Sequence, residues 1–273
     1  MSAFGLVYSR HPNGRHSPNL PLPRTPFVGR QTELDQIVQR LTHEPGCRLL
    51  TLTGIGGIGK TRLALEAVRH IAANHCAEFR HGIIFVPMLE AHTPEQMVVN
   101  LAAALHVSFG GKKVSVAPLL DFLREKEMLL VIDNFEHLLD ESDFLEAILT
   151  QAPHVKLLLT SRERLNFYEE WVFPLTGLRY PTAADDAEPM EFEAVQLFMQ
   201  VAQRTTRFEA DGMDATAVSR ICHLLEGVPW ALNWLRLGQT VLLAPRLLPK
   251  LSGGWMCCKL RGVTSPAITA ACA

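Results

Sequence analysis

Eight consecutive residues, Gly54 to Thr61 (GIGGIGKT), match the phosphate-loop pattern G-x-x-x-x-G-K-[ST]. Glycines let the backbone turn tightly and direct several N–H groups at phosphate oxygens. The lysine adds a full positive charge for the β- and γ-phosphates, and the threonine hydroxyl can bind Mg²⁺. We expect the following residues to hold the phosphates and the metal: Gly54, Gly56, Gly57, Ile58, Gly59, Lys60, Thr61 and Arg62.

The loop lies in the sequence context that this chemistry requires. An apolar run at 49–53 predicts a buried strand before it, and apolar residues at helical spacing over 60–73 predict a helix after it. The N-terminus of such a helix carries a partial positive charge that favours bound phosphate. In this context an accidental glycine-rich turn is the weaker interpretation.

A second acidic motif follows a very apolar run. Residues 128–133 (MLLVID) read as a buried strand that ends in Asp133, which is the Walker B pattern. At the carboxyl edge of a parallel sheet this carboxylate would lie beside the phosphate loop. We expect Asp133 to hold Mg²⁺ together with Thr61, directly or through water. The alternative is an aspartate that caps the next helix.

The residues for hydrolysis are less well defined. Many ATPases place a glutamate directly after the Walker B aspartate, where this chain has Asn134. Glu136 and His137 follow and could contact water or the γ-phosphate, and surface positions on a helix are an equal alternative. We therefore expect slow ATP hydrolysis or none.

The elements that must position these residues alternate along the chain. The pattern predicts strands at 49–53, 82–87, 128–132, 155–160 and 171–175. It predicts helices at 32–41, 60–73, 94–105, 119–127 and 135–149, and later at 191–203 and 215–225. Fully apolar strands alternating with helices indicate an α/β fold whose parallel sheet is covered by helices on both faces, and a partial, smaller helical domain follows it.

We therefore divide the chain into four parts. Residues 1–26 hold five prolines and no acid, which is typical of a disordered linker. Residues 27–180 form the expected phosphate-loop domain, and residues 181–232 form the partial helical domain. Residues 233–273 are expected to be a non-native or disordered tail.

The end of the chain differs from the rest in composition. No Asp or Glu follows Glu226, while five basic residues do. One interpretation is a basic tail for an acidic partner. We favour a shift of the reading frame just before Asn233, because the shifted frame can restore acidic residues and helical periodicity. The chain would then be truncated and would lack effector domains, and the nucleotide sequence of the gene decides between the two.

Bulk composition excludes several other classes of protein. The formal net charge of −2 gives no signal for nucleic acid, and no two of the six cysteines are spaced as C-x-x-C. No run of about 18 apolar residues predicts a membrane span, and the first residues do not resemble a signal peptide. We expect a cytoplasmic protein without membrane contact.

Five motifs in this order resemble a known family. They are FVGR at 27–30, the phosphate loop, LVIDNFEHL at 130–138, LTSR at 159–162 and EGVP at 226–229. The set, which spans roughly residues 23–232, resembles the STAND class of signalling ATPases that contains the NB-ARC domains. It is most similar to the nucleotide-binding module of bacterial LuxR-type large transcriptional regulators.

The resemblance implies further roles. Phe27 and Val28 would contact the adenine, and Pro229 would pack on it from the helical domain. Arg162 would be the arginine that senses the γ-phosphate. The simpler alternatives are a solvent-exposed arginine after a strand and a proline that starts a helix after Gly227. Such proteins bind ATP or ADP with Mg²⁺ as switches, and their ATP state self-associates.

An ATP-hydrolysing motor, a kinase and a DNA-binding regulator are the alternatives to this switch. An AAA-type motor or another P-loop ATPase would hydrolyse ATP in steady state, and Arg162 or Arg164 could serve as its arginine finger. A kinase would need a cluster of lid arginines and an acceptor site, which the sequence does not show. No helix-turn-helix with a basic recognition helix is evident, so no direct nucleic-acid contact is expected from this fragment.

Overall fold

The computed structural model describes residues 20–21, 23, 25–107, 115–182, 185–204 and 215–234. Most of the expected linker 1–26 and nearly all of the tail 233–273 lie outside these residues. The chain divides into two compact units, which are described separately. The first comprises residues 1–25, 31–54 and 60–174, and the second comprises residues 26–30, 55–59 and 175–273.

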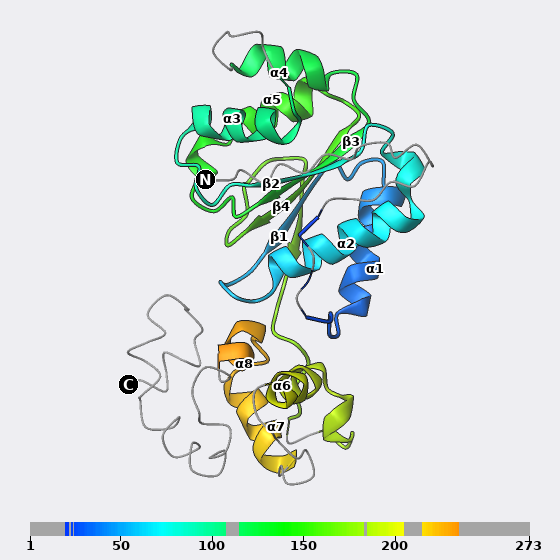
Figure 1. The fold of residues 1–273 in the computed structure, drawn as a ribbon, viewed down its shortest axis with the longest axis vertical. Helices are drawn as coiled ribbons and strands as arrows, with labels where there is room; N and C mark the ends of the chain where they lie inside the picture. Colours follow the sequence, from blue (N-terminus) through cyan, green and yellow to red (C-terminus); the bar gives the residue numbers. More distant parts are fainter. Residues whose placement is uncertain are drawn as a thin grey trace. The chain divides into compact units, whose positions relative to one another are not determined.

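The first unit is built on a five-stranded sheet in the order β2-β3-β4-β1-β5 (Figure 1). Every neighbouring pair of strands is parallel. The strands are β1 (Leu49–Thr53), β2 (Ile83–Pro87), β3 (Met128–Asp133), β4 (Val155–Ser161) and β5 (Glu170–Pro174). Because the strands are parallel, their carboxyl ends share one edge, which therefore collects Asp133 and the end of β4.

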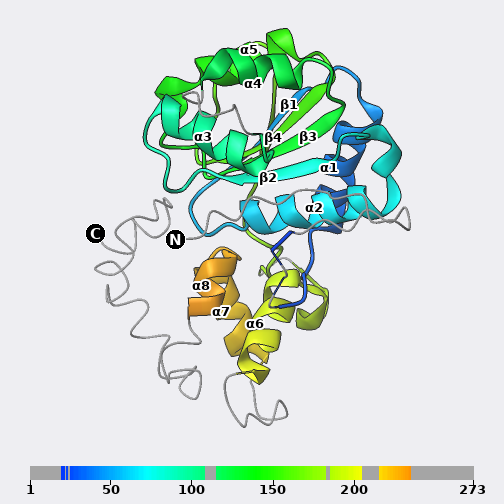
Figure 2. The same ribbon diagram turned by 45° about the horizontal axis from the view of Figure 1, so that its top comes forward.

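Helices cover both faces of this sheet (Figures 1 and 2). One face carries α1 (Gln31–His43) and α2 (Lys60–Asn74). The other carries α3 (Pro94–Ala104), α4 (Val116–Leu123) and α5 (Asp143–Gln151). Short 3₁₀ turns lie at Cys76–Glu78 and Leu139–Glu141. Coverage on both faces explains why the central strands are apolar at nearly every position.

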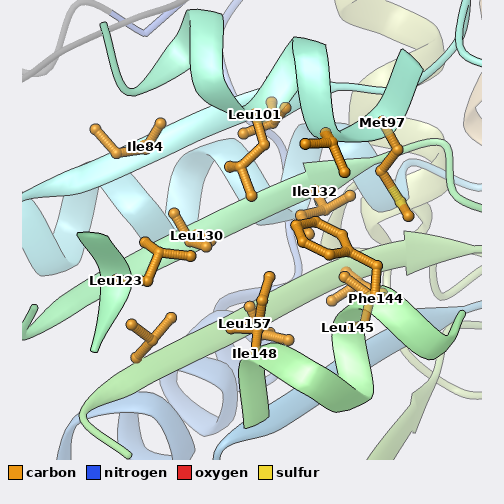
Figure 3. Packing of buried hydrophobic residues seen from close by; sticks show 14 of the residues in the cluster. Ile84, Met97, Leu101, Leu123, Leu130, Ile132, Phe144, Leu145, Ile148 and Leu157 are labelled. Carbon is orange, nitrogen blue, oxygen red and sulfur yellow. The ribbon is translucent and has the colours of Figure 1, made fainter. Parts of the chain in front are cut away.

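The main apolar core lies between the sheet and the helices α3, α4 and α5 (Figure 3). Leu130 and Ile132 of β3 are fully buried there with Leu101 of α3 and Ile148 of α5. Burying one such side chain contributes roughly 1.5–3 kcal/mol. This packing anchors one face of β3, and β2 and β4 pair with it on either side, so a rigid element places Asp133 at its end.

Two expected helices differ from the structure. The helix expected over 135–149 begins only at Asp143. Asn134 takes a left-handed conformation with φ 63°, and the N–H of Phe135 donates to the carbonyl of Thr160 at 3.0 Å, which holds the chain in a turn. The helix expected over 119–127 is found at Val116–Leu123, because Pro118 is tolerated in a first helical turn.

The second unit contains a small helical core. Its helices are α6 (Glu193–Gln203), α7 (Ala215–Leu224) and α8 (Pro229–Trp234), with a 3₁₀ turn at Pro189–Glu191. Phe192, Phe198, Ile221 and Leu232 are among its buried residues. Two segments from earlier in the chain, 26–30 and 55–59, belong to this unit. Across the described part of the chain, every helix is too short or too polar to cross a membrane.

Candidate functional site

Three side chains meet at the carboxyl edge of the sheet in the first unit. Oδ1 of Asp133, at the end of β3, accepts hydrogen bonds from the hydroxyls of Thr61 and Thr160, each at 2.6 Å. Thr61 is the second residue of α2, and Thr160 lies in the neighbouring strand β4. The structure thus brings the residue after the phosphate-loop lysine to the Walker B aspartate.

Thr160 was not anticipated as a site residue. It is fully buried, and its hydroxyl accepts the N–H of Asn134 at 3.0 Å while donating to Asp133. One hydroxyl group therefore fixes both the carboxylate and the backbone that follows it. In the sequence Thr160 belongs to the LTSR motif at 159–162, but its residue type and its place at the end of an apolar strand do not reveal its contact with Asp133.

Burial dominates the electrostatics of Asp133 and Lys60. Burial raises the pKa of Asp133, and the hydrogen bonds from Thr160 and Thr61 oppose that rise. Burial lowers the pKa of Lys60, and the negative charge of Glu136 opposes it. Lys60 is only 7% exposed, and its ammonium group donates to the carbonyl of Gly54 at 2.7 Å. The ammonium group is therefore held at the carbonyl of the first glycine of the motif.

An ion pair lies at the same edge of the sheet. Nε of Arg162, directly after β4, is 3.2 Å from Oε1 of Glu136, which follows β3. The other oxygen of Glu136 is buried and has no hydrogen-bond partner within the described residues. Nε2 of His137 lies 2.9 Å from the carbonyl oxygen of Met88, just past β2, so its ring is held at that strand. The structure thus pairs Glu136 with Arg162 and ties His137 to the residue that follows β2.

The tip of the phosphate loop packs inside the second unit. The N–H of Trp230 in α8 donates to the carbonyl of Gly57 at 3.1 Å. Gly57 has φ +77°, and a Cβ built on it would lie 2.4 Å from Cβ of Trp230. Only glycine accommodates both the left-handed backbone and this approach.

The FVGR segment and the start of α8 lie near the same loop tip within the second unit. A Cβ on Gly59 would be 3.5 Å from Nη1 of Arg30 and 3.9 Å from Cγ of Pro229. Arg30 is 3% exposed and donates from Nη2 to the carbonyl of Thr176 at 2.7 Å. Its backbone N–H donates to Oε1 of Glu193 at 2.8 Å. Phe27 and Val28, just before it, are half-buried.

Arg62 contacts the end of the Pro-rich segment, which precedes α1. Its guanidinium donates to the carbonyl of Thr25 at 2.5 Å, and Arg69, two helical turns later, donates to the carbonyl of Pro21. Leu20, in the same segment, is 6% exposed. The last residues of the Pro-rich segment are thus fastened to α2 by two main-chain contacts.

The donors at the edge of the sheet fit Mg²⁺ better than a transition metal. Within the described ranges, no three His, Cys, Asp or Glu side chains are grouped as metal ligands. Mg²⁺ typically uses one or two carboxylates, waters and the phosphates of a nucleotide. Asp133 and the hydroxyl of Thr61 fit that set. Their oxygens lie 2.6 Å apart, close enough for one ion to contact both.

Comparisons with known proteins agree with this geometry. Residues 26–160 match the family model described as the AAA ATPase domain. The chain is 28% identical over 242 residues to an uncharacterized protein of Mycobacterium tuberculosis, an alignment that covers 88% of the chain and 55% of that protein. It is 35% identical over 191 residues to a protein of the same organism named as a candidate HTH-type transcriptional regulator, covering 68% of this chain and 20% of that protein.

A solved structure shares the fold. It is the STAND protein with a tetratricopeptide repeat sensor from Pyrococcus horikoshii, with a TM-score of 0.53 and 17% identity, covering 85% of this chain and 33% of that chain. The expected α/β P-loop fold, with a parallel sheet covered on both faces, is confirmed. The chain spans about half the length of the first relative and a fifth of the second.

Proposed function

We propose that the chain is the ATP/ADP-binding switch module of a STAND-type signalling ATPase, and the match of residues 26–160 to the AAA ATPase domain supports this proposal. The observation that carries the proposal is the hydrogen bond of 2.6 Å between Thr61 and Asp133. It joins the first turn after the phosphate-loop lysine to the Walker B carboxylate, which is the arrangement that Mg²⁺ and a nucleotide need.

Each residue of the phosphate end then has a role. The backbone N–H groups of Gly54 to Gly59 and the Lys60 ammonium bind the phosphates, as the loop motif and its place before α2 support. Thr61 and Asp133 hold Mg²⁺, and Thr160 keeps the carboxylate oriented. When bound, the metal neutralises phosphate charge. Arg62 is proposed to assist from the same helical turn.

We assign the adenine end to the second unit. Phe27, Val28 and Pro229 are proposed to contact the base, because FVGR and the start of α8 both lie near the loop tip. Phe27 offers an aromatic face and Pro229 a flat apolar ring. Gly59 approaches both Arg30 and Pro229, which supports placing the base on this side of the loop.

The signalling role draws on the relatives. One relative is named as a candidate HTH-type transcriptional regulator, and the Pyrococcus protein is named as a STAND protein with a repeat sensor. We propose that this chain performs the nucleotide step of such a LuxR-type regulator in the cytoplasm. ADP would favour a closed form and ATP a self-associating one, since a ligand shifts an equilibrium by its differential affinity for the two states.

A second candidate is an AAA-type motor with steady-state hydrolysis. Glu136 favours it, because one of its carboxylate oxygens is buried without a hydrogen-bond partner in the described part of the chain, and a carboxylate near the phosphates can orient water. A steady-state phosphate-release assay separates the two. Many turnovers per minute support the motor, while tight retention of nucleotide with little turnover supports the switch.

Nucleotide binding is tested by titrating the folded chain with Mg²⁺ and ADP or ATP in a thermal-shift experiment. Ligand at about a hundred times its dissociation constant should add roughly 2.7 kcal/mol of stability. Lys60→Ala should weaken binding about ten- to a hundredfold, because it removes a charge-assisted contact. Lys126→Ala, which removes a lysine whose ammonium lies over Phe122, serves as the matched control. The proposal would be overturned if the folded wild-type chain had the same melting temperature with and without either nucleotide.

A further inference from the structure

The pair between Glu136 and Arg162 lies at the edge of the sheet that also holds Asp133. Glu136 follows β3 and Arg162 follows β4, and these strands are neighbours in the sheet. Both charges act on the phosphate-loop cation: Glu136 raises the pKa of Lys60 and Arg162 lowers it. The ion pair is therefore within electrostatic range of the group that binds the β- and γ-phosphates.

The contact between the two side chains is a single-point one. Only Nε of Arg162 and Oε1 of Glu136 are joined, at 3.2 Å, and the second carboxylate oxygen is buried without a hydrogen-bond partner within the described residues. The Arg162 side chain is 55% exposed, whereas that of Glu136 is 20% exposed. The arginine is thus the member that can move, and the carboxylate is the member that stays.

We propose that Arg162 restrains Glu136 when no γ-phosphate is present, and that binding of ATP draws Arg162 onto the γ-phosphate and so releases Glu136 as the base for hydrolysis. This inference rests on the nucleotide-binding function proposed above. A doubly charged phosphoryl group attracts a guanidinium more strongly than one single-point carboxylate contact does. ADP lacks that group, so the pair persists with ADP bound.

The reaction that follows release is ordinary ATP hydrolysis. The oxygen of a water molecule forms a bond to the γ-phosphorus, and the bond from that phosphorus to the β–γ bridging oxygen breaks, with the electron pair leaving on ADP. The carboxylate of Glu136 accepts the proton of the water and passes it to the phosphate products. Arg162 therefore acts first as a restraint on Glu136 and then as a sensor of the γ-phosphate.

A double-mutant cycle tests the coupling through binding alone. Dissociation constants for ATPγS and for ADP, each with Mg²⁺, are measured by calorimetry for wild type, Glu136→Gln, Arg162→Gln and the double variant. Glu136→Gln should shift the preference toward ATPγS by about two- to fivefold, because Arg162 no longer has to leave a partner. In the Arg162→Gln background the same substitution should leave the preference unchanged.

The cycle separates release of the arginine from simple relief of repulsion. Losing a negative charge near the γ-phosphate would favour ATPγS equally with or without Arg162, so an equal shift in both backgrounds overturns the inference. Glu163→Gln removes the same charge next to Arg162 and should not alter the preference.

Single-turnover hydrolysis is a second test. Glu136→Gln should slow hydrolysis by about 10²–10⁴-fold and bind ATPγS more tightly than wild type. If the ion pair were only structural, the same variant would lose both hydrolysis rate and affinity for ATPγS. If wild type binds no nucleotide, both this inference and the proposed function fall. If it binds nucleotide and the cycle is additive, only the coupling falls.

Discussion

At the scale of single residues, the motif residues were predictable from sequence, but the long-range contacts that some of them make were not. Lys60, Thr61 and Asp133 were identified from short patterns, and the structure brings Thr61 and Asp133 within 2.6 Å. Thr160 and Arg30 hold the site through contacts to residues 27 and 163 positions away, respectively. No local pattern encodes such contacts, because they arise only once the strands are ordered. The roles of Glu136, Arg162 and the adenine contacts stay predictions.

Asp133 carries a conflict between stability and function, and this predicts the behaviour of Asp133→Asn. Because burial raises the pKa of Asp133 in the folded chain, its contribution to stability is full below the unfolded value of 3.8 and is lost as the pH rises through the folded pKa. At neutral pH the ionised group is therefore penalised in the folded state. Asn keeps an acceptor for Thr61 and Thr160 without that charge, so the nucleotide-free variant should melt at a higher temperature than wild type.

Melting curves from about pH 4, near the ordinary pKa of an aspartate, up to about pH 8 check this expectation. The advantage of Asp133→Asn should shrink as the pH falls, and Mg²⁺ with ADP should stabilise it far less than wild type. Asp121→Asn, at an exposed pair with Arg124, is the control. A variant that melts below wild type at neutral pH would show that the carboxylate stabilises the empty site.

At the scale of elements, sequence patterns placed the strands well because β1 to β4 are buried at nearly every position, whereas the edge strand β5 is partly exposed. Strand β1 was expected at 49–53 and is found there. The turn after β3 was missed, since residues 135–149 carry a helical pattern while the backbone of Asn134 and Phe135 is captured by Thr160. A tertiary hydrogen bond outweighed local preference there, and the helix starts eight residues later at Asp143.

The contact between the loop tip and α8 predicts the effect of Gly57→Ala. The added methyl group would lie 2.4 Å from Cβ of Trp230 on a backbone with φ +77°. The left-handed conformation alone costs roughly 1–2 kcal/mol for a residue with a side chain, and displacing α8 adds to that. We expect a lower free energy of unfolding in denaturant titrations.

Gly46→Ala is the matched control for that measurement. No atom lies within 4 Å of the position its Cβ would take, so its effect should stay within about 0.5 kcal/mol. Equal stability of Gly57→Ala and Gly46→Ala would mean that the loop tip does not pack on α8 in solution.

At the scale of the whole molecule, the sequence motifs are distributed over two compact units. The sequence order suggested a sheet domain followed by helices. The structure groups 26–30 and 55–59 with the later helices, although both segments precede most of the sheet in the chain. Such grouping could not be deduced from periodicity, because it depends on which neighbours a short loop finds in space.

The switch proposal predicts a nucleotide-dependent change in assembly. With Mg²⁺ and ATPγS the chain should elute from a sizing column as a larger species than with Mg²⁺ and ADP, because ligands shift populations only through differential affinity. Lys60→Ala should elute alike under both conditions. Identical elution of wild type with the two nucleotides, at concentrations that saturate binding, would contradict self-association of this chain.

The fastening of the Pro-rich segment to α2 has its own consequence. Arg62 and Arg69 grip the carbonyl oxygens of Thr25 and Pro21, which every amino acid possesses. Replacing the side chains at positions 21 and 25 would thus leave both hydrogen bonds in place, while replacing either arginine by an uncharged residue would remove one of them. The position of Leu20 relative to the helix that opens with Lys60 therefore depends on two arginines of that helix and on main-chain oxygens, and not on the side chains of residues 21 and 25.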